Sequence, residues 1–166
     1  ALLPRLMERS GRTPAGSITG FYNVLVEADD LNEPISDAVR GILDGHIVLS
    51  RRLAHRGQYP AVDIMESISR VQPEVVDAET LAASRRLRGL AARYMENEDM
   101  INLGAYAAGA NPEIDQACQI MPALNAFLRQ EIQERATLAD TFKRLKELAG
   151  QSRQARCRSF MGHAQQ

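Results

Sequence analysis

The sequence contains no tryptophan, two cysteines, and no apolar run that approaches the roughly 18 residues of a membrane-spanning helix. Cys118 falls on a helical apolar stripe and Cys157 in a polar tail, which favours a core thiol and a separate thiol over a disulfide. The three histidines show no ligand spacing with one another or with cysteine, so we predict no metal site. A reducing, cytoplasmic compartment is therefore expected.

A strong charge of either sign is also missing. Basic and acidic residues number 20 and 21 and the net charge is −1, so no general attraction to nucleic acid or to an anionic membrane is expected. The first residue is not Met, and Leu3, Leu6 and Met7 already form one side of a helical pattern. We therefore expect the chain to be a piece of a longer protein.

The first half of the chain carries all the strand signals. Residues 17–26 are rich in β-branched and aromatic side chains and almost uncharged, which predicts a strand buried on both faces of a parallel sheet. A helix is predicted from Pro34 to about Gly45, because Pro suits a first helical position and Gly a helix end. His46–Ser50 is a second strand candidate. Strand, helix and strand in this order predict a right-handed parallel crossover and an α/β core.

Beyond Pro73 the pattern is helical. Asp77 is a predicted N-cap for a helix that ends near Met95, and Asn111 caps a second helix that Pro122 is expected to break or kink. A last helix is predicted from about Thr137. We place a domain boundary near residues 72–77 and expect three parts, which are an α/β part, a helical domain and a disordered tail, at residues 1–74, 75–150 and 151–166.

Five segments in this order closely resemble the C-terminal half of the catalytic domain of type III secretion ATPases, including the flagellar export ATPase. That family is similar in turn to the catalytic subunits of rotary F-type ATP synthases. The resemblance continues into the helical part at residues 102–109 and 126–130, and covers roughly residues 2–149. The five segments are Gly16-Ser-Ile-Thr-Gly-Phe-Tyr22, Glu27-Ala-Asp-Asp-Leu-Asn-Glu-Pro34, Leu43-Asp-Gly-His-Ile-Val-Leu-Ser-Arg51, Gln58-Tyr-Pro-Ala-Val-Asp63 and Ser67-Ile-Ser-Arg70.

The resemblance implies the C-terminal part of a RecA-like, parallel-sheet nucleotide-binding domain, followed by a helical C-terminal domain. It implies a homo-hexameric ATPase that uses ATP with Mg²⁺ to energise flagellar or type III protein export. The implied partners are a coiled-coil stalk protein, an export chaperone with its cargo, and the inner-membrane export gate, which the protein meets peripherally from the cytoplasm. Nucleic acid is not among them.

The phosphate-binding motif Gly-x-x-x-x-Gly-Lys-Ser/Thr does not occur in this sequence. The glycine-bearing segment Gly11–Ser17 contains no Lys and is interpreted as a loop. In the family, the Asp that holds magnesium and the Glu that activates water lie upstream of the segments matched here. We therefore predict that the isolated chain does not hydrolyse ATP.

Four residues are implied as nucleotide contacts. In the family, the Arg that ends the Ser-Ile-Ser-Arg motif, here Arg70, reaches into the nucleotide site of the adjacent subunit, where a guanidinium can stabilise the charge that develops during phosphoryl transfer. Tyr59 and Pro60 are placed against the adenine base, and Ala107 on its other side. Taken from the residues alone, Arg70 could equally be a salt-bridged surface side chain, Tyr59 a packing residue, and Ala107 part of a close helix contact.

The acidic pair Asp29 and Asp30 ends the first predicted strand. The resemblance places this loop at the central hole of the hexamer, facing the stalk, and a solvated turn remains the alternative. Two basic clusters are interpreted as solvated helix faces, with anionic lipid or an acidic partner as the alternative ligand; they comprise Arg51, Arg52, His55 and Arg56, and Arg85, Arg86, Arg88 and Arg93.

A second class of function stays open beside the export ATPase. The chain would then be a non-catalytic interaction module that binds an export chaperone or a stalk protein through its helical domain. An RNA-translocating ring is disfavoured by the charge balance and by the lack of an aromatic and basic stripe.

Overall fold

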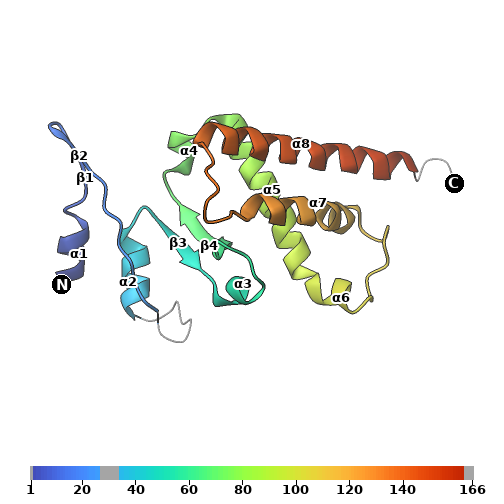
Figure 1. Cartoon of the computed structure of the whole chain (residues 1–166), viewed down its shortest axis with the longest axis horizontal. Coiled ribbons are helices and arrows are strands. Elements are labelled where there is room, and N and C mark those ends of the chain that lie inside the picture. Colours follow the sequence, from blue (N-terminus) through green and yellow to red (C-terminus); the bar gives the residue numbers. More distant parts are fainter. Residues whose placement is uncertain (1, 27–33, 163–166) are drawn as a thin grey trace.

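The computed structural model describes residues 2–26 and 34–162, and Figure 1 shows them as a thin N-terminal part beside a group of long helices. In chain order the elements are α1 (Leu2–Met7), β1 (Gly11–Thr13), β2 (Gly16–Ile18), α2 (Pro34–Ile42), β3 (Gly45–Leu49), α3 (Arg51–His55), β4 (Val62–Ser69), α4 (Gln72–Val75), α5 (Ala78–Glu96), α6 (Glu98–Asn102), α7 (Pro112–Leu128) and α8 (Leu138–Gly162).

The predicted strand at residues 17–26 is wrong. Strand β2 ends at Ile18 and pairs only with β1 in an antiparallel hairpin, and no regular structure follows it up to residue 26. Phe21 and Leu25 are 95% and 91% exposed. A strand buried on both faces needs neighbouring strands and covering helices, and the described residues supply neither here.

The predicted parallel crossover between the strand at residues 17–26 and the strand at 46–50 is likewise not formed among the described residues, because β2 and β3 lie in separate sheets and β3 pairs antiparallel with β4. The elements predicted on either side are present, since α2 begins at Pro34 and β3 begins at Gly45. Gly45 permits the two strands to approach closely, because a Cβ at this position would lie 2.7 Å from the carbonyl oxygen of Ile68.

The core of the molecule lies between α5, α7 and α8, which lie side by side in Figure 1. Side-chain oxygens of Asp77 and Asn111 accept hydrogen bonds from Thr80 N and Glu113 N, so both predicted N-caps are confirmed. Pro122 does not break α7, which continues through it to Leu128, because one lost backbone hydrogen bond is offset by burial of the apolar face on either side; the kink, the other expected outcome, stays a prediction. The buried core residues are Ala83, Leu87, Leu90, Ala91, Ala117, Ile120, Leu124, Leu148 and Ala149.

Helix α8 continues past residue 150 to Gly162, which corrects the expectation of a disordered tail for these residues. Ser152 is fully buried and connects α8 to both neighbouring helices. Its hydroxyl accepts a 2.7 Å hydrogen bond from Arg86 Nε, and its carbonyl oxygen accepts one from the side-chain amide of Gln116. Through these contacts α8 is attached to α5 and α7 at residue 152, although the polar sequence there does not predict such packing. No described helix is long and apolar enough to cross a membrane.

Candidate functional site

Arg70 directly follows β4 and is exposed. Its backbone N–H donates a 2.7 Å hydrogen bond to the carbonyl oxygen of Asp44, which extends the β3–β4 pairing by one step. Its Nη2 atom lies 3.4 Å from the carbonyl oxygen of Arg40 at the end of α2. The backbone of Arg70 is therefore fixed, whereas its guanidinium stands at the protein surface with one long contact.

Tyr59 and Pro60 form the turn between α3 and β4. The peptide bond between them is cis, and the turn begins with Gly57 at a φ of 69°, a left-handed conformation that favours glycine. Gln58 is buried, whereas the Tyr59 side chain is 60% exposed. The aromatic ring is therefore available to a ligand, and the residue before it anchors the turn.

Two contacts hold this turn against the helical part of the chain. Arg56 Nη1 lies 2.9 Å from Glu98 Oε1 at the start of α6. The carbonyl oxygen of Tyr59 accepts a 2.9 Å hydrogen bond from the backbone N–H of Gln130, just after α7. The position of Tyr59 therefore depends on residues far away in the sequence.

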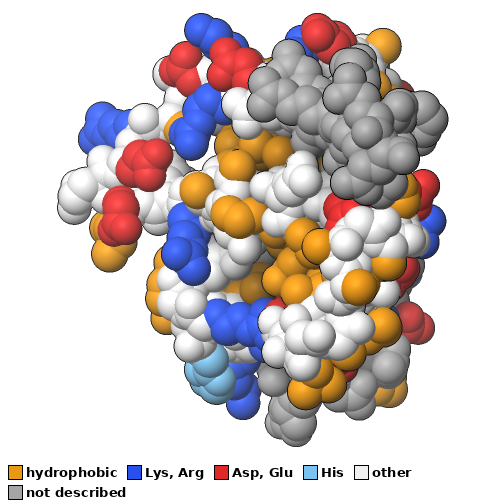
Figure 2. Space-filling view, turned by 90° about the vertical axis from the view of Figure 1, so that its right-hand side faces the viewer, with side chains coloured by type: hydrophobic (Ala, Val, Ile, Leu, Met, Phe, Trp, Pro, Cys, Tyr) orange, Lys and Arg blue, Asp and Glu red, His pale blue; other side chains and the backbone are white. Residues whose placement is uncertain are grey.

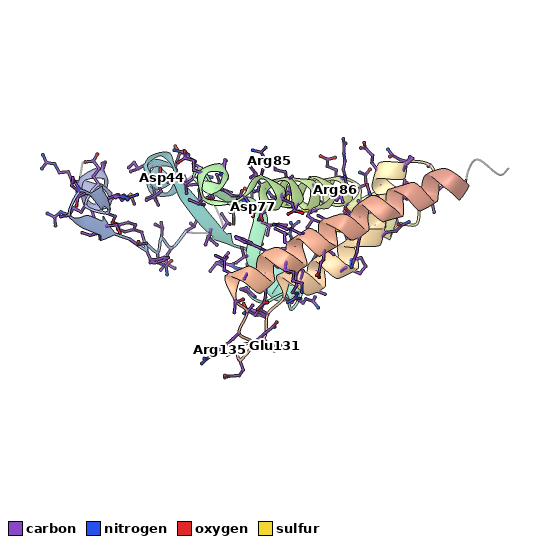
Figure 3. The ribbon with its side chains drawn as sticks, turned by 90° about the horizontal axis from the view of Figure 1, so that it is seen from above. Asp44, Asp77, Arg85, Arg86, Glu131 and Arg135 are labelled. Atoms are coloured by element: carbon purple, nitrogen blue, oxygen red, sulfur yellow. The ribbon has the colours of Figure 1, made fainter. Side chains whose placement is uncertain are left out.

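The sequence reasoning missed the segment at residues 129–137, between α7 and α8. It projects from the helices, as Glu131 and Arg135 show in Figure 3. Glu131 N donates to Glu134 Oε2 at 3.1 Å, which closes the segment locally, and Ile132 is 96% exposed. Gln130 is the last residue of the segment 126–130, which carries part of the resemblance. This was the one sequence signal that could have pointed to residues 129–137. Gln130 holds the start of this segment against the Tyr59 turn through its backbone hydrogen bond. Ile132, two residues further along, is therefore a further candidate for a base contact.

Ala107 lies in a different segment, between α6 and α7, and is exposed. The phenolic oxygen of Tyr106 lies 3.0 Å from both Asp115 Oδ1 and the carbonyl oxygen of Asn111, and Asp115 also accepts from Gly109 N. These bonds fix the loop around Ala107. No hydrogen bond or ion pair among the described residues connects Ala107 to Tyr59, so the pairing of these two residues around a base stays a prediction.

Asp29 and Asp30 lie outside the described residues. The second basic cluster is more than a solvated helix face, because three of its members make internal or ionic contacts. Arg86 donates to Ser152, Arg88 Nη2 lies 3.3 Å from the carbonyl oxygen of Met65, and Arg93 lies within ion-pair distance of Glu113. Within α3, Arg52 and His55 are exposed, which agrees with a solvated face.

The comparisons with known proteins agree with this arrangement. Residues 1–69 match a model of the ATP synthase alpha/beta family, nucleotide-binding domain, and residues 76–147 match a model of the T3SS EscN ATPase C-terminal domain. The "Flagellum-specific ATP synthase" of Bacillus subtilis is 51% identical over 150 residues, which are 90% of this chain and 34% of that protein. The chain belongs to the type III secretion and flagellar export ATPase family.

Other members of this export ATPase family support the same conclusion. The "Type 3 secretion system ATPase" of Pseudomonas syringae pv. syringae is 51% identical over 90% of this chain and 33% of its own length. The assembled ATPase EscN from enteropathogenic E. coli superimposes with a TM-score of 0.86 at 42% identity, over 89% of this chain and 36% of the EscN chain. The chain thus spans about a third of the length of the curated relatives it matches.

The fold class predicted from the sequence is confirmed, since a nucleotide-binding part is followed by the helical domain of an export ATPase. Tyr59 and Pro60 lie within the nucleotide-binding match, and Ala107 and Gln130 within the C-terminal match. Arg70 follows the end of the first match directly. The candidate residues are therefore contributed by both parts of the export ATPase chain and by the short connection between them.

Proposed function

We propose that the chain forms part of a hexameric ATPase that energises flagellar or type III protein export by ATP hydrolysis. The observation that carries this proposal is the identity of 51% with relatives named for both systems, extended over 90% of the chain. ATP with Mg²⁺ is the expected ligand of the complete protein, and its phosphates would bind a Gly-x-x-x-x-Gly-Lys-Ser/Thr loop, a motif absent from these 166 residues. The complete protein would act in the cytoplasm, peripherally at the inner membrane.

Arg70 is proposed to act in trans, on the nucleotide held by the adjacent subunit of the hexamer. Its exposed guanidinium and fixed backbone support this role, because a charge that meets the transferring phosphoryl group must be both accessible and positioned. Such a group contacts the nucleotide most strongly as charge develops, so it affects turnover more than binding.

Tyr59 and Pro60 are proposed to contact the adenine base, with the ring of Tyr59 providing a stacking surface. Its 60% exposure supports this role. Ile132 is added as a second apolar contact because its segment is hydrogen-bonded to Tyr59 through Gln130. Ala107 is retained as a weaker contact, since nothing described connects it to Tyr59. Asp29 and Asp30 are proposed to face a stalk protein.

The decisive experiment replaces Arg70 in the complete protein. Arg70→Ala should lower kcat by about 10³-fold, as such arginines do elsewhere, with little change in ATP affinity or assembly. Arg70→Lys should recover little, because an ammonium lacks the planar fork of donors. Lys143→Ala is the control, since Lys143 is an exposed basic residue on α8 and should retain normal turnover.

A trans role requires one further result. Mixing Arg70→Ala subunits with subunits disabled in their own phosphate loop should restore some turnover, because a hybrid interface can join an intact loop to an intact Arg70. If mixed rings form and no ratio of the two restores activity, Arg70 does not act in trans.

The alternative function is a non-catalytic module that binds a stalk protein or export chaperone through its helical part. The stalk-binding part of this alternative is supported by a solved structure of the assembled ATPase EscN in complex with its central stalk EscO, to which this chain is similar at a TM-score of 0.80. Figure 2 shows apolar side chains gathered on the face at the right-hand end of Figure 1, with charged side chains around them, as is common where proteins interact. Under this alternative the purified chain should bind a coiled-coil stalk and lack magnesium-dependent ATPase activity. Turnover by the pure chain would exclude this alternative.

A further inference from the structure

Strand β4 carries a large bulge three residues before Arg70. The pairing of β3 with β4 joins Val48 to Asp63 and His46 to Ile68, so that residues 64–67 of β4 face Ile47 alone. A bulge bends its strand and changes where the following side chains point. The direction in which Arg70 leaves the sheet is therefore set at this bulge.

Two polar side chains close the bulge. Asp63, which is 8% exposed, accepts hydrogen bonds at Oδ1 from Met65 N at 2.9 Å and Glu66 N at 3.2 Å. The Ser67 hydroxyl donates to the carbonyl oxygen of Asp63 at 2.5 Å and accepts from Val48 N at 3.0 Å. One hydroxyl thus joins the two ends of the bulge and connects them to β3.

The Ser67 hydroxyl also connects the bulge to β3. Val48, which pairs with Asp63 at one edge of the bulge, donates its N–H to Ser67 Oγ at 3.0 Å. Directly after Ser67 the ladder resumes at Ile68 and ends with the bond from Arg70 N to Asp44 O. Because side chains alternate along a strand, a slip of one residue here would turn Arg70 to the opposite face.

The body of the bulge is held separately by the helical core. Ile64 and Met65 pack against the cluster between α5, α7 and α8, and the carbonyl oxygen of Met65 lies 3.3 Å from Arg88 Nη2. Removing the Ser67 hydroxyl therefore leaves the attachment to α5 intact. It releases only the short stretch between the bulge and Arg70.

We propose that Ser67 is a positioning residue that holds Arg70 in the orientation needed for catalysis on the neighbouring subunit. The inference rests on the trans role proposed above for Arg70. In this role Ser67 needs no contact with the nucleotide, because it acts by fixing the register of β4, which Arg70 directly follows. Its loss should lower turnover through Arg70 and leave nucleotide binding, which depends on other residues, nearly unchanged.

The test uses the complete protein with three variants. Ser67→Ala should lower kcat about tenfold, the effect expected when the two hydrogen bonds of one hydroxyl are lost, while the KM for ATP stays within about twofold. Ser67→Thr should restore most of the turnover, because it keeps the hydroxyl and its branched side chain suits a strand. Ser69→Ala is the matched control: it removes an exposed hydroxyl of the same motif and should leave kcat unchanged.

A double variant separates this proposal from the function on which it rests. In an Arg70→Ala background, Ser67→Ala should cause no further loss of turnover, and an additional tenfold loss would overturn the positioning role. If Arg70→Ala itself has wild-type turnover, the trans function fails instead. Amide hydrogen exchange then tests the role of Ser67 without relying on turnover. Exchange at the Val48 and Arg70 amides should be faster in Ser67→Ala than in the wild type. Unchanged exchange at both amides would overturn the proposal.

Discussion

The two parts of the chain that match different family models differ sharply in how they bury apolar residues. Among the described residues before Arg70, the buried apolar side chains are Met7 and Val39, whereas residues 76–152 contain a connected core around Leu87. Yet the segment with Phe21 and Leu25 is apolar in sequence and almost fully exposed in the structure. Burial thus follows the packing partners that the chain itself supplies, and exposed apolar clusters of this kind mark surfaces that pack against other segments or chains.

The two parts also differ in what they contribute to the candidate site. Arg70 and Tyr59 lie in or just after the less buried part, while some of the contacts that fix their surroundings come from the helical part. Gln130 binds the Tyr59 turn, and Arg88 binds the bulge before Arg70. The candidate site residues therefore lie at the edge of a packed helical core. Variants in the less buried part and in the helical part can test this difference between them.

The largest contrast is expected in amide hydrogen exchange of the isolated chain. Local opening ranges from nearly no cost in exposed segments to the full unfolding free energy in a core. Amides of α5 and α7 around the core should therefore exchange about 10³-fold or more slowly than those at residues 19–26, where no regular backbone pairing is described. Equal protection in both stretches would contradict the difference in burial.

A core truncation should separate the two parts nearly as clearly. Leu87 is 2% exposed, so Leu87→Ala should lower the free energy of unfolding by about 2–5 kcal/mol through lost burial and a cavity. Ile47→Ala is the partner variant, since Ile47 is 74% exposed in β3 and should change stability by less than about 0.5 kcal/mol. Urea unfolding measures both; a large cost at Ile47 would show that the sheet has a core of its own.

Nucleotide affinity tests the chemical side of the comparison. In the complete protein, Tyr59→Ala should weaken ATP binding by about 1–3 kcal/mol, the range for base stacking on an aromatic ring. Tyr59→Phe should be mild because the ring is kept. Ile132→Ala should have a smaller effect in the same direction, and titration calorimetry would detect both. An unchanged affinity in Tyr59→Ala would leave Tyr59 as a packing residue only.

The smallest expected effect concerns the start of α5. Hydrogen bonds from the backbone and side chain of Thr80 hold the pKa of Asp77 at about 2, below its ordinary 3.8. The ionised carboxylate is therefore favoured in the folded state, so its contribution to stability is present above about pH 4 and is lost as the pH falls towards 2. Asp77→Asn should flatten the decline of the unfolding free energy across this window. An equally steep decline in Asp77→Asn would assign the pH dependence to other carboxylates.

The helical part was largely predictable because its signals are local. Asp77 and Asn111 have short polar side chains that favour an N-cap, and α5 and α7 begin directly after them, as predicted. The strand at residues 17–26 failed because strand formation depends on distant partners that the sequence pattern does not identify. The bulge before Arg70 was hidden for a related reason: Asp63 and Ser67 differ little from ordinary strand residues until their hydrogen bonds are seen.

The candidate site was predictable only in part. The resemblance proposed Tyr59 and Arg70 as nucleotide contacts, and both residues are exposed. It did not reveal that Gln130 binds the Tyr59 turn, because that pair is separated by about 70 residues and joined through the backbone. The grouping of Ala107 with Tyr59 stays a prediction.

The buried hydroxyl of Ser152 has a consequence for how α8 can move. Apolar side chains tolerate sliding between alternative packings, but a hydrogen bond to a buried donor does not. A shift of one residue along α8 would displace Ser152 by about 1.5 Å and rotate it by about 100°, away from Arg86 and Gln116. The three helices therefore fit together in one discrete alignment, and a force along α8 is transmitted to α5 and α7 through Ser152 instead of moving α8 past them.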